Sequence, residues 1–188
     1  MEKDRVIALA KEAGFAAAEV ISTNDLKFAH EFRKYCEDNA CGNYNKNYGC
    51  PPYCGTPQEM EDKVMRYRQA VVFQSKTPVE DVFDDSVTKK IKKKHTQMTF
   101  HTMEALREHG LITDGMPVMA GPCNLCDACE MPKGKPCIHE EKRFSCLSAY
   151  CVDAVALART CGMEMQWNGD VVSFFSLYLF DRAEEENQ

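Results

Sequence analysis

Four cysteines in one short stretch constrain what this chain can fold into more than any other sequence feature. Cys123, Cys126 and Cys129 follow one another with two residues between each pair, and Cys137 comes after seven more. Three thiolates on one loop can occupy three corners of a cubane iron–sulfur cluster, and a fourth from the next turn completes it. Soft thiolates select iron–sulfur clusters, zinc or copper(I) over hard cations. The stretch therefore predicts a metal site.

Zinc is the alternative metal for these residues, which we name the second cysteine group: Cys123, Cys126, Cys129 and Cys137, in the loop 121–138. Zinc sites usually pair two short segments that each supply two ligands. Here three of the cysteines crowd into one short loop, a spacing that favours a cubane over a single tetrahedral ion. We expect one [4Fe–4S] cluster at this group.

A first cysteine group lies upstream, in the loop 36–55, and contains Cys36, Cys41, Cys50 and Cys54. The loop is rich in glycine, asparagine and proline, and an irregular segment of this length in a compact domain is usually functional. The Cys50–Cys54 pair does not open a radical-SAM motif, because Pro57 stands where that motif needs its next cysteine. We expect all four residues to bind metal, as a second [4Fe–4S] cluster or as zinc.

Cys54 comes two residues before a strong helix start at Thr56 and Pro57. The positive end of the helix dipole and the free N–H groups of its first turn favour thiolate over thiol. The sequence therefore predicts that Cys54 is a ligand in its thiolate form.

The three remaining cysteines, Cys146, Cys151 and Cys161, flank or lie within a predicted helix. Buried free cysteine behaves as a small hydrophobic residue, and we interpret all three as packing residues. No pair of histidines has ligand spacing, although His139 closely follows Cys137. Nucleotide-binding glycine loops, HExxH and Gly-x-Ser-x-Gly are all missing from the sequence, so catalytic residues stay unknown.

Eleven cysteines in 188 residues would indicate a disulfide scaffold in a short secreted chain. The chain instead starts with an alternately charged, helical pattern rather than an apolar signal sequence. We therefore expect a cytoplasmic protein that uses its cysteines as ligands. No apolar run approaches the ~20 residues of a membrane span, so no membrane association is expected.

The formal net charge of −6 disfavours nucleic-acid binding, which depends on neutralising phosphates. The basic run Lys89–Lys94 follows several acidic residues, and Asp85 and Lys89 have the spacing of a helical ion pair. We interpret the run as a solvated helix face. The alternative is a docking patch for an acidic redox partner.

Hydrophobic periodicity predicts an α+β fold in one domain, residues 1–188, with helices packed on a small, mainly antiparallel sheet and both cysteine loops at one end. Thr56, Pro57 and Glu59 have the pattern of a capping box at a helix start. The apolar run at 171–180 predicts a buried, central strand. Further helices are predicted at 3–13, 79–108 and 147–160, and further strands at 18–22, 70–75 and 117–120. Phe83 and Val87 are expected on the apolar side of the helix 79–108, and Val152 and Val155 on the inner side of the helix 147–160.

Three motifs taken together resemble a known family. They are Cys41-Gly-Asn-Tyr through Cys50-Pro-Pro, Gly121-Pro-Cys-Asn-Leu-Cys through Cys137, and Ala149-Tyr-Cys-Val-Asp-Ala-Val. They are similar to those of the cysteine-rich predicted metal-binding proteins of domain of unknown function 2284, small cytoplasmic proteins frequent in anaerobes. The resemblance covers nearly the whole chain. It implies metal or iron–sulfur binding at both cysteine groups, and it implies no particular reaction.

From these patterns we expect an intracellular iron–sulfur protein with up to two [4Fe–4S] clusters that transfers electrons to or from a partner protein. The alternatives are a zinc-binding module without redox chemistry, and an enzyme with an open iron on one cluster. Cys54 decides between carrier and enzyme, because a cluster with four thiolates has no open iron for a substrate. With Cys54 as a ligand, the sequence predicts a carrier.

Overall fold

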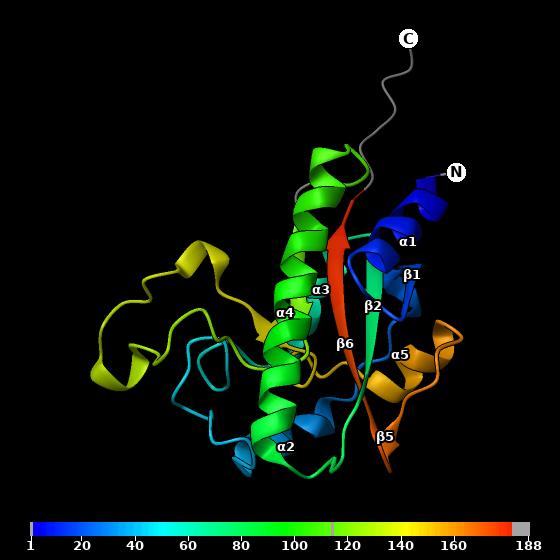
Figure 1. Ribbon diagram of the computed structural model, residues 1–188. Coiled ribbons are helices and arrows are strands. Elements are labelled where there is room, and N and C mark those ends of the chain that lie inside the picture. Colours follow the sequence, from blue (N-terminus) through cyan, green and yellow to red (C-terminus); the bar gives the residue numbers. More distant parts are fainter. Residues whose placement is uncertain (1, 114, 182–188) are drawn as a thin grey trace.

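Six strands form one sheet in the computed structural model, which describes residues 2–113 and 115–181 (Figure 1). The strand order is β1-β2-β6-β3-β4, and β5 pairs with β6. All strand pairs are antiparallel except β3 with β4. The predicted mainly antiparallel α+β fold is therefore confirmed. The strands are β1 Ala17–Ser22, β2 Gln69–Pro78, β3 Gly115–Met119, β4 Ser145–Cys146, β5 Trp167–Asn168 and β6 Val171–Phe180.

The central strand is β6, as its apolar sequence predicted. It pairs along its whole length with β2 on one side, and with β3 and the short β5 on the other. Every residue from Val172 to Phe180 is buried. Both faces of β6 are covered, so its apolar residues run continuously instead of alternating with polar ones.

Helices cover both faces of the sheet (Figure 1). On one face, α1 (Glu2–Glu12) and α4 (Asp85–Glu108) pack over Val71 and Phe73 of β2. On the other face, α3 (Pro57–Met65) and α5 (Ala154–Thr160) pack over Val72. The alternation along β2 follows from the two-residue period of a strand. The short helix α2 (Arg33–Glu37) leads into the first cysteine loop.

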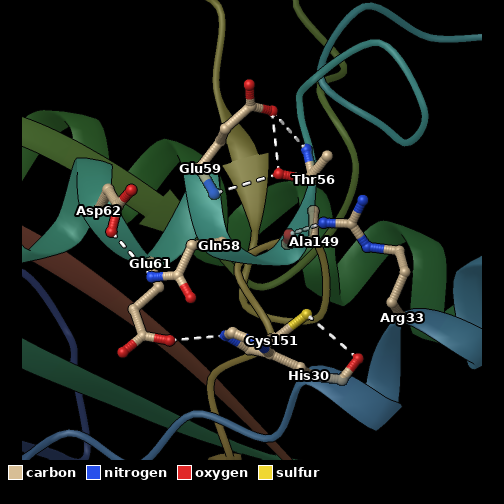
Figure 2. Close-up of polar contacts among 9 residues, drawn as sticks. All are labelled: His30, Arg33, Thr56, Gln58, Glu59, Glu61, Asp62, Ala149 and Cys151. Carbon is tan, nitrogen blue, oxygen red and sulfur yellow. Dashed lines mark hydrogen bonds and ion pairs between the residues drawn. The ribbon is translucent and has the colours of Figure 1, made fainter.

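The predicted capping box begins α3. The Thr56 side chain accepts a hydrogen bond from the Glu59 N–H at 3.3 Å, and the Glu59 carboxylate accepts one from the Thr56 N–H at 2.7 Å (Figure 2). These bonds satisfy N–H groups that the helix itself leaves free. The box fixes where the first cysteine loop ends.

The prediction that a helix begins near Val79 is wrong, because α4 begins at Asp85. The Asp84 carboxylate caps it, accepting the N–H groups of Ser86 at 2.8 Å and Val87 at 3.2 Å. Val79 is still part of the extended chain after β2, and Phe83, expected on the buried side, is 84% exposed. Lys89, Lys90, Lys93 and Lys94 on α4 are exposed, and Lys89 pairs with Asp85 at 3.3 Å. The interpretation of this run as a solvated face stays a prediction.

The predicted helix at 147–160 is also shorter than expected, since α5 begins at Ala154. Asp153 caps it by accepting the N–H groups of Val155 and Ala156, both at 2.9 Å. Just before the cap, Cys151 has a φ of +56°, a left-handed conformation that breaks an α-helix. Val155, expected to face inward, is 46% exposed.

The two cysteine loops lie side by side at one end of the sheet, as predicted (Figure 1). The first follows α2, and the second joins β3 to β4. Among the helices in the described residues, none has the length and apolar character needed to cross a membrane.

Candidate metal centres

The structure brings the four cysteines of the second group together around one cavity. Asn47, Tyr48, Leu125, His139 and Arg143 complete its lining, along with Cys123, Cys126, Cys129 and Cys137. Burial is the main cause that raises the pKa of the Cys126 thiol, and the neighbouring thiols of the group raise it further. The residues that the sequence pattern selected are therefore neighbours in space, on one loop.

The polypeptide enters this loop from β3 through Gly121. A Cβ atom at Gly121 would collide with the Lys92 side chain on α4, so the loop passes close to this helix and a larger residue would displace the lysine. On the far side, the Tyr48 hydroxyl of the first loop donates a hydrogen bond to the Lys135 carbonyl at 2.5 Å. The second loop is thus held between α4 and the first loop.

The first cysteine group is assembled differently. Cys36 lies on α2, Cys41 is exposed in the turn that follows, and Cys50 is only 5% exposed. Cys54 is partly buried in the turn before α3, and its N–H donates to the Cys50 carbonyl at 3.1 Å. The loop therefore places the four thiols at different depths.

The expected lowering of the pKa of Cys54 does not occur. Burial raises the pKa of this thiol, and this effect outweighs the opposing charges of Arg33 and Lys63. The position of Cys54 before a helix start predicted a lowered pKa, and this direction is wrong because desolvation of the thiolate outweighs the favourable charges.

One further thiol reaches the first group from the end of β4. Burial raises the pKa of Cys36 to about 11, and the largest charge contribution after burial comes from Cys146. The same order holds for the raised pKa of Cys50. Sequence analysis interpreted Cys146 as a packing residue, because its nearest cysteines in sequence belong to neither predicted group. No local spacing signal could have placed it.

Of the other two cysteines, Cys151 lies near the first group, where it helps to raise the pKa of Cys36 and where burial raises its own pKa against the charge of Arg33, while Cys161 lies apart from both groups. Cys151 is fully buried, and its sulfur lies 4.0 Å from the His30 carbonyl oxygen (Figure 2). Cys161 packs against the hydrophobic core on the α3 and α5 side of the sheet. Their interpretation as packing residues stays a prediction.

Arg33 ties the first group to the segment around Cys146. It is 7% exposed, and it donates from Nη1 to the Gly55 carbonyl at 2.7 Å. Its Nη2 donates to the Ala149 carbonyl at 2.8 Å (Figure 2). Its Nε has no hydrogen-bond partner among the described residues. A buried guanidinium with one unsatisfied donor needs a compensating negative charge.

The two cysteine groups adjoin through the first loop. Asn47 donates to the Cys123 carbonyl at 2.8 Å and accepts from the Gly49 N–H at 2.9 Å. Next to this contact, the Tyr48 and Tyr53 rings meet edge to face at 4.6 Å, and the Arg143 guanidinium lies over both at 5.9 and 5.8 Å. These contacts place the first loop directly against the second.

The donor sets of both groups consist of thiols, which iron–sulfur clusters and structural zinc accept. All eleven cysteines are free thiols, so the donors of each group fit a thiolate-bound centre by their chemistry. Within the described part of the chain, no three Cys, His, Asp or Glu side chains are arranged to hold a single metal ion. The fit thus rests on residue type and not on a coordination geometry.

A comparison with protein-family models finds a match that spans most of the chain. The model described as "Predicted metal-binding protein (DUF2284)" matches residues 19–180, which include every residue of both cysteine groups. Neither the curated proteins nor the solved structures contain a match to this chain. The resemblance drawn from the motifs is confirmed, and the chain belongs to this family of predicted metal-binding proteins.

Proposed function

We propose that this protein is a cytoplasmic iron–sulfur protein that holds one [4Fe–4S] cluster at each cysteine group and exchanges electrons with a partner protein. The observation that carries the proposal is the second group. Its four thiols line one cavity, and three of them have the cysteine spacing that opens ferredoxin cluster motifs. A reducing cytoplasm is the compartment that keeps so many thiols free.

Each centre would draw on thiolates of its own group. Cys123, Cys126, Cys129 and Cys137 would hold the second centre; Cys36, Cys41 and Cys50 would supply three thiolates of the first. A bound cluster supplies one-electron redox chemistry, tuned by burial and by hydrogen bonds to the sulfurs. Tyr48 lines the second cavity and pairs with Tyr53 under Arg143, so these side chains would keep water from that centre.

Anaerobic purification followed by iron, sulfide and zinc analysis tests the proposal. We expect about eight iron atoms and as much sulfide per chain, since each of two cubanes holds four of each. We also expect a broad absorbance at the blue end of the visible range that dithionite bleaches. A colourless protein with stoichiometric zinc would contradict the proposal and support a zinc-binding module.

Replacing Cys126 tests the second centre alone. Cys126→Ser should remove about half of the iron, because the loop then lacks one of the four thiolates that a closed cubane needs. Cys161→Ser is the matched control, since Cys161 packs against the core outside both groups. Full iron content in Cys126→Ser would show that the second group does not hold a cluster.

A further inference from the structure

We propose that Cys146, at the end of β4, is the fourth thiolate ligand of the first metal centre, in place of Cys54. The ligand set is then Cys36, Cys41, Cys50 and Cys146. This inference rests on the proposed function for the existence of that centre. The inference adds to the first centre a ligand, Cys146, that follows the second loop in the sequence.

The hydrogen bonds of Arg33 bring the segment of Cys146 to the first group. Arg33 lies one helical turn before Cys36, so both residues share one side of α2. Its bond to the Ala149 carbonyl fixes the turn that begins at Cys146, where the Tyr150 N–H donates to the Cys146 carbonyl at 3.1 Å. Cys36 and Cys146 therefore sit on segments that one buried side chain connects.

A second contact brings Cys50 to the same segment. A Cβ atom at Gly49 would collide with the Phe144 carbonyl oxygen, so the backbone just before Cys50 packs directly on the backbone just before Cys146. Phe144 is buried, and β4 pairs with β3 through Cys146 and Met119. The pairing of β4 with β3 therefore fixes Cys146 close to the part of the first loop that contains Cys50.

Electrostatic contacts join every pair of the four proposed ligands. Burial is the largest cause that raises the pKa of Cys36, Cys50 and Cys146, and thiol neighbours add to each. Cys146 and Cys41 act on Cys36; Cys146, Cys41, Cys54 and Cys36 act on Cys50; and Cys41 acts on Cys146. Cys146 also acts on Cys54. These effects agree with the backbone contacts at Arg33 and Gly49, on which the assignment rests.

The sulfur of Cys54 lies 3.9 Å from the Gly55 carbonyl oxygen, a neighbour that does not stabilise a thiolate. Burial raises the pKa of both thiols, and backbone N–H groups oppose it at both, those of Ala149 and Ser148 at Cys146 and its own at Cys54. The contact with a carbonyl oxygen therefore distinguishes Cys54 from Cys146. Hydrogen bonds to the sulfurs are among the contacts that tune cluster sites.

The same assignment gives Arg33 a counter-charge. Its hydrogen bonds go to two neutral carbonyls, those of Gly55 and Ala149, and no carboxylate pairs with it among the described residues. A centre held by four thiolates carries net negative charge. Against the larger effect of burial, Arg33 acts to lower the pKa of Cys36 within the proposed set as well as those of Cys54 and Cys151 beside it. The buried cation and the thiolate site therefore stabilise each other.

The test compares three serine variants of the anaerobically purified full-length protein. Cys146→Ser should lose about half of the iron and sulfide, while Cys54→Ser and the control Cys161→Ser should keep all of it. The electron paramagnetic resonance spectrum of reduced Cys146→Ser should keep the signal of the second centre alone. The double variant Cys126→Ser/Cys146→Ser should hold almost no iron.

Retention of the second-centre signal shows that Cys146→Ser has folded, so its iron loss would not reflect misfolding. Full iron in Cys146→Ser, or iron loss in Cys54→Ser, would overturn the assignment of Cys146 in place of Cys54. A wild-type protein without any cluster would instead refute the proposed function, and the two failures are thus distinguishable.

Discussion

The two cysteine groups are built in opposite ways. All four members of the second group come from the loop between β3 and β4, within the stretch 123–137. The first group spreads over the end of α2, a long turn and, by our proposal, the end of β4. One site is local in sequence, and the other needs the folded sheet to bring its members together.

This difference separates what holds each site. All four thiols of the second group belong to one loop, so their arrangement depends mainly on that loop. The loop contacts the rest of the protein through hydrogen bonds such as those from Asn47 to the Cys123 carbonyl and from Tyr48 to the Lys135 carbonyl. The first group depends on the buried side chain of Arg33 and on close backbone packing at Gly49. Loss of the contacts of Arg33 and Gly49 should therefore reduce the metal content of the first site far more than that of the second.

The largest expected effect comes from Arg33→Met. The change leaves the Gly55 and Ala149 carbonyls without their donors, and unsatisfied buried acceptors are costly. We expect the free energy of unfolding to fall by roughly 3 kcal/mol, with iron lost from the first centre before the second. Urea denaturation and iron analysis measure both effects.

Arg143→Met is the matched control at the second site. Arg143 stacks over the rings of Tyr48 and Tyr53 rather than bonding buried carbonyls, and such contacts contribute about 1 kcal/mol or less. Equal losses of stability in the two variants would break the comparison between an assembled site and a local one.

A smaller effect is expected from Gly49→Ala, which places a methyl group against the Phe144 carbonyl oxygen and close to the Cys123 side chain. Overpacking of this kind costs roughly 2 kcal/mol. In the second loop, Gly134→Ala meets open space but must adopt a φ of +67°, at a cost of about 1 kcal/mol. Thermal melts should therefore rank Gly49→Ala as the more destabilised variant, and the reverse order would show that the loops do not pack as described.

The same contrast explains what the sequence could predict. Cys123, Cys126 and Cys129 can be recognised as metal ligands from the sequence, because their spacing along the chain is typical of a cluster loop. The capping box at Thr56 and Glu59 can be recognised in the same way, because its residues are three positions apart. Cys146 was assigned to packing because its relation to Cys36 and Cys50 exists only after β4 has joined the sheet. Sequence patterns therefore predict sites whose residues are close in sequence, but not sites whose residues meet only through tertiary contacts.

Two helix starts were misplaced for a related reason. The spacing of Phe83 and Val87 continued a helical pattern backwards past Asp84, whose carboxylate in fact begins α4. Likewise, Leu147 and Val152 are buried apolar residues that fit a helical period, although they lie in the turn around Cys151. Apolar spacing alone does not distinguish a helix from a buried turn, whereas the aspartate caps at Asp84 and Asp153 do.

The last expected effect develops only as the pH falls, and it concerns the sheet on which the first group depends. His95 lies between β2 and β6, where its ring nitrogens bond Ser75 at 2.7 Å and Ser176 at 2.9 Å. Burial lowers the pKa of His95 to about 3. The unfolded chain takes up this proton near pH 6.5, while the folded protein does not, so stability is constant above that pH and falls below it by roughly 1.4 kcal/mol per pH unit. Urea denaturation between pH 7 and 5 should show this slope in the wild type and a shallower one in His95→Gln; equal slopes would mean that acid acts through the thiolate sites instead.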